Sequence, residues 1–125
     1  MSDKPLLERL RVKGARTFAV ANLDPKLEAG FDLPCPRVAV EAADVVLAFA
    51  ANRTDLDAML PGVLKALKPG AILWVAYPKL TSKLAGDLNR DIIHNLVPAY
   101  GLDTVSQIAV DADWSALRFK RVAAP

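Results

Sequence analysis

Two nearly uninterrupted apolar runs, separated by a helical pattern, constrain this chain more than any other feature. The runs are Asp44–Ala50 (DVVLAFA) and Ala71–Tyr77 (AILWVAY). A strand that is apolar on both sides is typical of a parallel sheet covered on both faces. Between the runs, leucine, valine and methionine recur every three or four residues, as in an amphipathic helix. This order predicts an α/β fold with a mainly parallel sheet and right-handed crossovers.

The ends of this helix are marked by residues that favour helix boundaries. Thr54 and Asp57 have the spacing of a capping box and predict the start. The sequence Lys68-Pro69-Gly70 predicts the end. Pro61 lies inside the pattern and has no backbone N–H to donate, so we expect it to kink or split the helix.

The second half of the chain predicts another helix and a closing hairpin. The helix is expected from Asp87 to Tyr100, and Gly101 is well placed to end it. Two apolar-rich stretches follow, Asp103–Val110 and Ala116–Val122. The short link between them favours an antiparallel connection.

The front of the chain is less regular. Pro5–Arg11 predicts a short helix, because proline suits a first helical position and the leucines share one face. Thr17–Ala21 predicts a first strand. The prolines at 34 and 36 exclude a continuous helix there, and Val38–Val40 is expected as a short edge strand.

The composition predicts a single ordered domain over residues 1–125. The chain is 53% hydrophobic, 24% charged and has a mean hydropathy of +0.22, which favours a homo-oligomer or another covering partner, with an alanine-rich proteome as the alternative explanation. Its net charge is +2 and its basic residues form no dense stripe, so no nucleic-acid binding is expected. No apolar run approaches the roughly 20 residues of a membrane span. A single cysteine and a polar start predict a cytoplasmic location.

Two segments resemble a known fold family. The segment DVVLAFAANRTDLDAMLPGVLKALKPGAILWVAYPK resembles the middle of a Rossmann-like, S-adenosylmethionine-dependent methyltransferase, and GLDTVSQIAVDADWSALRFKR resembles its closing hairpin. The resemblance covers Asp44–Arg121 and implies a three-layer α/β sandwich, shortened at the front, that ends in an antiparallel hairpin. The stretches LWVAYPK and DWSALRF are also similar to a family of small bacterial proteins of unknown function.

The front half departs from the methyltransferase pattern where the cofactor would bind. Those enzymes carry a glycine-rich turn after the first strand, because glycine lets the backbone approach the cofactor. This chain has Asn22-Leu23-Asp24-Pro25 in that place. The family's acid for the ribose hydroxyls also lacks a clear counterpart, since the neighbours of Glu41 do not fit that role. We therefore expect no cofactor, with S-adenosylmethionine held through Asn22, Asp24 and Asp44 as the remaining alternative.

Candidate ligand-binding residues follow the predicted strands. Ligands of open parallel sheets bind beyond the carboxyl ends of the strands, where the segments after the three strands should converge. Asparagine side chains there can hydrogen-bond to a ligand or only cap the local backbone. Lysine and arginine side chains can hold an anion or only face solvent. An anion near Thr81 and Ser82 is a further hypothesis, with Asp87 as a helix cap as its alternative. The candidates are Asn22, Asp24, Asn52, Arg53, Tyr77, Lys79 and Arg90.

Five other residues are expected to be structural. Trp74 lies inside an apolar strand and should belong to the core, while Trp114 should pack near the hairpin, with Arg118 stacking on it or pairing with a nearby aspartate. His94 has no ligand-type residue at metal-binding spacing, so no metal site is expected. Cys35 has no neighbour that would activate its thiol.

Three functions remain open from the sequence. The first is a non-catalytic interaction or regulatory module, with a partner pairing at an open sheet edge near the first strand. The second is a small-molecule binding protein or enzyme that takes an anionic or nucleotide-like ligand in the strand-end crevice. The third is a divergent methyltransferase.

Overall fold

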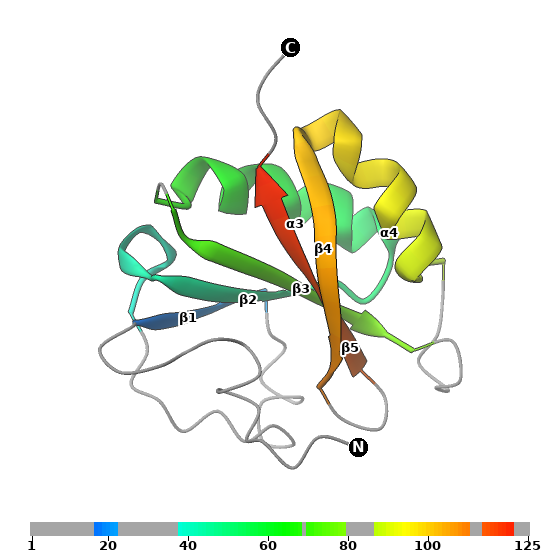
Figure 1. Ribbon diagram of the computed structural model, residues 1–125, viewed down its shortest axis with the longest axis horizontal. Helices are drawn as coiled ribbons and strands as arrows, with labels where there is room; N and C mark the ends of the chain where they lie inside the picture. Colours follow the sequence, from blue (N-terminus) through cyan, green and yellow to red (C-terminus); the bar gives the residue numbers. More distant parts are fainter. Residues whose placement is uncertain (1–16, 23–37, 69, 80–86, 111–113, 122–125) are drawn as a thin grey trace.

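The computed structural model describes residues 17–22, 38–68, 70–79, 87–110 and 114–121. These residues form an α/β fold around a five-stranded sheet in the order β1-β2-β3-β5-β4 (Figure 1). The strands are β1 (Phe18–Ala21), β2 (Val45–Phe49), β3 (Ile72–Pro78), β4 (Leu102–Ala109) and β5 (Trp114–Arg121).

The sheet is mixed rather than mainly parallel in its pairings. β1 pairs with β2, and β2 with β3, in parallel. β5 lies between β3 and β4 and is antiparallel to both, so the neighbour pairs of the described strands divide evenly. The predicted antiparallel hairpin is present, and it carries a β-bulge between Thr104 and Ser106.

Both faces of the central strands are buried, as their apolar runs predict. All five residues of β2 are buried. Val46 and Ala48 belong to one core cluster, whereas Val45, Leu47 and Phe49 belong to a second cluster on the opposite face. The alternation of side chains along a strand explains this division.

Trp74 also lies in the core, as predicted, with 1% of its surface exposed. It belongs to the second cluster, together with Phe18 and Trp114.

The two α-helices of the described residues, α3 (Arg53–Ala66) and α4 (Arg90–Leu96), pack against the first cluster (Figure 1). Leu56 and Leu60 of α3 and Ile93 of α4 are fully buried there. The described ranges therefore supply a sheet and one helical layer. The predicted third layer, like the predicted helix Pro5–Arg11, falls outside them.

The first predicted helix is present, but its start differs from the prediction. The N-cap is Asn52, whose Oδ1 accepts a hydrogen bond from the Asp55 backbone N–H at 2.8 Å, so the capping box predicted at Thr54 and Asp57 is wrong. β2 ends at Phe49, and the chain can enter the helix two residues earlier than expected. Pro61 does not split the helix, which is continuous from Arg53 to Ala66.

The second predicted helix is shorter than expected. α4 ends at Leu96 and continues as the 3-10 helix η2 (Val97–Tyr100), with Pro98 near its start. Gly101 follows at φ 73° and ends it, as predicted. The N-cap is Asn89, not Asp87, because the Asn89 side chain accepts a hydrogen bond from the Ile92 N–H at 3.0 Å.

The short strand predicted at Val38–Val40 is wrong. The segment begins a second 3-10 helix, η1 (Val40–Ala42). The Val38 backbone N–H nevertheless donates to the Phe18 carbonyl at 2.9 Å, so the chain contacts the outer edge of β1 at that point without forming a strand.

Candidate functional site

The carboxyl ends of β1, β2 and β3 lie at one edge of the sheet, because these strands are parallel and in register. Asn22 directly follows β1 and has φ 59°, a left-handed conformation. Asparagine tolerates this conformation better than most residues because its short polar side chain can bond locally. The turn after β1 is therefore built on asparagine where the methyltransferase pattern has glycine.

The side chain of Asn22 joins two turns of the protein to each other. Its Nδ2 donates to the Phe49 carbonyl at 2.7 Å and to Asp55 Oδ1 at 3.0 Å. The other carboxylate oxygen of Asp55 accepts from the Ala51 N–H at 3.0 Å. We call this network of Asn22, Phe49, Ala51 and Asp55 the Asn22–Asp55 clamp. It ties the end of β1 to the turn between β2 and α3.

Asn52 and Arg53 have structural contacts at the start of α3. The Asn52 side-chain oxygen caps the helix, as described above. The Arg53 backbone N–H donates to Asp87 Oδ1 at 2.7 Å, and its guanidinium lies 3.8 Å from Asp57. Asp87 therefore connects the segment before α4 to the first turn of α3.

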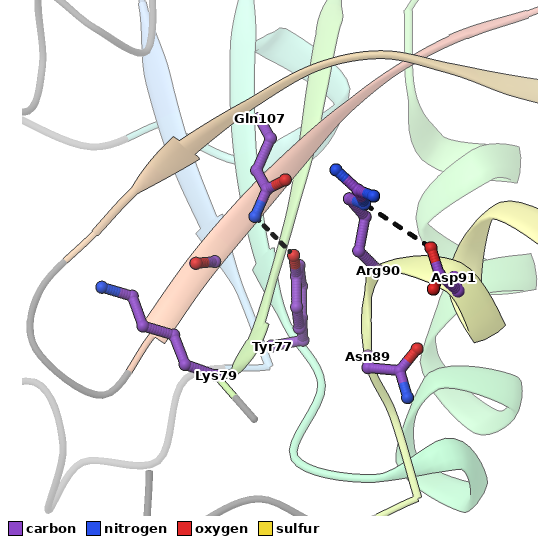
Figure 2. Close-up of a pocket in the computed structure, with 7 residues that line it drawn as sticks. Tyr77, Lys79, Asn89, Arg90, Asp91 and Gln107 are labelled. Atoms are coloured by element: carbon purple, nitrogen blue, oxygen red, sulfur yellow. Dashed lines mark hydrogen bonds and ion pairs between the residues drawn. The ribbon is translucent and has the colours of Figure 1, made fainter. Parts of the chain in front are cut away.

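Tyr77, Lys79 and Arg90 lie around one cavity of about 350 Å³ at the carboxyl end of β3 (Figure 2). The predicted residues thus form two groups. Tyr77, Lys79 and Arg90 line this cavity, whereas Asn22, Asn52 and Arg53 lie beside β1 and β2. Asp24, Thr81 and Ser82 lie outside the described residues. The cavity is completed by Asn89, Asp91, Gln107 and Ser115.

Tyr77 forms the floor of this cavity and is 3% exposed. Gln107 reaches it from β4, and its Nε2 donates to the Tyr77 hydroxyl oxygen at 3.0 Å (Figure 2). Burial raises the pKa of Tyr77 above its ordinary value, while a side-chain hydrogen bond with Ser115 acts in the opposite direction. The phenol is therefore neutral and protonated at neutral pH.

The charged groups of the cavity lie at its rim. Lys79 follows the end of β3 and is partly exposed. Arg90 Nε lies 3.6 Å from Asp91 Oδ1, and both side chains are largely exposed. An exposed ion pair of this kind contributes little, typically 0–1 kcal/mol, so Arg90 is available to another anion.

A second hollow of about 360 Å³ adjoins the first and shares Arg90, Asp91 and Gln107 with it. His94 lies in this hollow, with its Nδ1 2.7 Å from Thr104 Oγ1. Among the described residues, no three histidine, cysteine or acidic side chains gather as metal ligands would.

Asp44 lies at the opposite end of β2 from Asn52, so it does not join the clamp. Its carboxylate lies 2.6 Å from Lys68 Nζ and accepts a hydrogen bond from the Thr17 backbone N–H at 2.9 Å. These contacts lower the pKa of Asp44 from 3.8 to about 2. The idea that Asp44 and Asn22 hold one cofactor together has no support from this placement.

Trp114 packs near the hairpin, as expected. It is 4% exposed, and its ring meets that of Phe49 edge-on, with centroids 5.5 Å apart. Asp111 and Asp113, proposed as partners of Arg118, lie outside the described residues.

Sequence reasoning missed three residues that shape the two groups: Asp55, Gln107 and Ser115. It singled out Asp87 only as a helix cap, whereas Asp87 accepts a hydrogen bond from the Arg53 N–H. Asp55 had a usable signal, because an acid three residues after an asparagine cap is common at helix starts. Gln107 and Ser115 had none, since their position depends on the register of the hairpin.

Comparison with solved structures shows the fold. The chain is similar to a ribosomal protein L11 methylase from Lactobacillus delbrueckii subsp. bulgaricus, with a TM-score of 0.50 and 12% identity over 90% of this chain and 61% of that chain. It is also similar to LepI in complex with SAH and a substrate analogue, with a TM-score of 0.53 and 12% identity over 93% of this chain and 39% of the other. The chain thus spans less than two thirds of either protein.

Two other comparisons, with curated proteins and with protein families, give one match. A search of curated proteins gives no match. None of the described helices is long and apolar enough to cross a membrane. The family described as "Protein of unknown function (DUF3052)" matches residues 36–123, most of the chain, and the chain belongs to that family.

Proposed function

We propose that this protein is a non-catalytic interaction or regulatory module that keeps a methyltransferase-like fold. The observation that carries the proposal is the Asn22–Asp55 clamp. Glycine-rich turns hold a cofactor because their backbone is bare and their N–H groups are free. Here the first residue after β1 carries a side chain, and that side chain bonds to Phe49 and Asp55 of the protein itself.

The polar groups beside the clamp are likewise committed to the fold. Asp55 accepts hydrogen bonds from Asn22 and from the Ala51 N–H through separate oxygens. The Asn52 oxygen caps α3. A ligand at this edge would have to replace these bonds, each with a net contribution of about 0.5–1.5 kcal/mol. The arrangement therefore favours a rigid scaffold over a cofactor cradle.

The proposal is tested by thermal unfolding of the full chain with S-adenosylmethionine or S-adenosylhomocysteine. A ligand at 100 times its Kd adds about 2.7 kcal/mol to the free energy of unfolding. We expect no shift at millimolar concentration, with an active methyltransferase as the positive control. A saturable upward shift with either compound would overturn the proposal.

A second candidate is a binding protein for a small anionic ligand, which the Tyr77 cavity favours. Lys79 and Arg90 at its rim supply positive charge, and the volume of about 350 Å³ lies in the range of small-molecule sites. The same unfolding assay applies, with inorganic phosphate, small carboxylates and nucleotides as ligands. If none of them stabilises the protein, this candidate is removed.

The first proposal includes a partner that pairs with a sheet edge, and it includes a cytoplasmic location. Among the described strands, β1 and β4 are the outermost. The contact of Val38 with Phe18 occupies part of the outer edge of β1, which supports β4 over β1 as the pairing edge. Light scattering at high protein concentration tests self-association, and a monomer would remove it. Cell fractionation tests the location.

A further inference from the structure

The floor of the Tyr77 cavity is built from three neighbouring strands. Tyr77 of β3 lies directly opposite Ser115 of β5 in the strand register. Ser115 is also buried, with 5% of its surface exposed. Gln107 comes from β4, on the far side of β5. Because paired strands hold all three backbones, the polar atoms are fixed before any ligand arrives.

The Tyr77 hydroxyl has one proton to donate and two polar neighbours, Gln107 and Ser115. A phenol can accept hydrogen bonds at its oxygen and can donate one proton. The oxygen accepts from Gln107 Nε2 at 3.0 Å. Ser115 also bonds with this hydroxyl, and the serine hydroxyl can act as donor or as acceptor. When Ser115 donates its proton to the Tyr77 oxygen, the phenol proton is left for an acceptor in the cavity.

The charges around this donor favour an anionic acceptor. Lys79 and Arg90 contribute two positive charges to the lining and Asp91 one negative charge. Figure 2 shows Lys79 and Arg90 on opposite sides of the Tyr77 ring. Burial raises the pKa of Tyr77, so the phenol keeps its proton at neutral pH and adds no competing negative charge.

We infer that this cavity binds a small oxyanion, a carboxylate or a phosphate, with the Tyr77 hydroxyl as its central hydrogen-bond donor and Lys79 and Arg90 at the rim. The inference rests on the second candidate function and names the ligand class and the binding group. Hydrogen bonds to charged groups are stronger than those between neutral groups, so Tyr77 supplies orientation and affinity together.

The test is an NMR titration of the full chain, in separate arms, with inorganic phosphate and with acetate. The two arms distinguish phosphate from carboxylate as the preferred oxyanion. We expect saturable shifts at the Gln107 side-chain amide and the Ser115 N–H. Tyr77→Phe removes the proton donor and keeps the ring, and it should weaken binding about tenfold or more.

Rim and control variants separate charge from hydrogen bonding. Lys79→Ala should weaken binding and reduce its dependence on salt. Lys65→Ala, an exposed position near the end of α3, should leave binding unchanged. Far-ultraviolet circular dichroism and the melting temperature show whether each variant is folded.

The outcomes of the titration are distinct. If Tyr77→Phe binds either anion as well as the parent protein does, the proposed donor role is wrong. If the parent protein binds neither anion, the inference is overturned; the second candidate function fails with it unless a nucleotide stabilises the protein in the unfolding assay, and the proposal of a non-catalytic module is unaffected. If shifts occur but neither Tyr77→Phe nor Lys79→Ala changes them, the anion binds elsewhere and the inference is overturned.

Discussion

Replacing Asn22 should destabilise the protein in two separable steps, one from the side chain and one from the backbone. Asn22→Gly removes the hydrogen bonds to Phe49 and Asp55 but allows the left-handed φ of 59°. Asn22→Ala removes the same bonds and also places a Cβ in that conformation. Comparing the two variants therefore isolates the backbone contribution.

The magnitudes follow from the contacts. A net hydrogen bond contributes about 0.5–1.5 kcal/mol, and the bond to Asp55 is exposed, so we expect Asn22→Gly to lose about 1–2 kcal/mol. A non-glycine residue in the left-handed region costs about 1–2 kcal/mol, part of which asparagine offsets by local bonding. Asn22→Ala should therefore lose about 2–3 kcal/mol in total.

Urea unfolding of the three proteins, followed by tryptophan fluorescence, measures these differences. Trp74 and Trp114 are both buried and report on loss of the core. For 125 residues, 1 kcal/mol corresponds to about 4 °C in melting temperature, which gives an independent check. Asn95→Ala, at an exposed position on α4, is the matched control and should change stability by less than about 0.5 kcal/mol.

Two results would refute this reasoning. If Asn22→Gly is as stable as the parent, the hydrogen bonds of the clamp do not stabilise the fold. If Asn22→Ala equals Asn22→Gly in stability, the left-handed conformation is not maintained in solution.

Three further predictions concern the core, a helix cap and acid stability. Leu60→Ala, at a fully buried position, should lower the free energy of unfolding by about 2–5 kcal/mol in urea, and a loss below 1 kcal/mol would show that the site is not packed. Asn89→Ala should cost about 0.5–2 kcal/mol through loss of the cap, measured in the same way; an unchanged midpoint would argue against that cap. Because the pKa of Asp44 is about 2 when folded and 3.8 ordinarily, its contribution is complete above pH 3.8 and is lost as the pH falls through about 2. The free energy of unfolding, measured across this window, should fall with decreasing pH, and Asp44→Asn should reduce the slope of this fall. An equal slope in both proteins would contradict the pairing with Lys68.

The central part of the fold was predictable because one simple signal dominates it. The runs that became β2 and β3 are apolar on both sides, as is typical of a strand covered on both faces. The end of the helical segment formed by α4 and η2 was equally clear, since Gly101 adopts the left-handed conformation that glycine favours. Helix starts were less certain, because Asn52 and Asn89 compete with nearby capping residues and tertiary geometry decides between them.

The position of Gln107 in the cavity could not be predicted, because it depends on a β-bulge. Leu102 at the start of β4 packs in the same cluster as Tyr77, so regular alternation would place Gln107 on the other face. The extra residue between Thr104 and Ser106 reverses the alternation, and Ile108 accordingly packs in the second cluster. Gln107 therefore reaches Tyr77. No local sequence pattern marks this bulge.

The most direct test of the central claim is an NMR titration of the full chain with S-adenosylhomocysteine, followed at the Asn22 side-chain amide and the Ala51 N–H. Both groups donate to Asp55 in the clamp. If the clamp has replaced the cofactor turn, neither signal should move at millimolar ligand. Saturable shifts at both signals would show that this edge still binds the cofactor and would contradict the account.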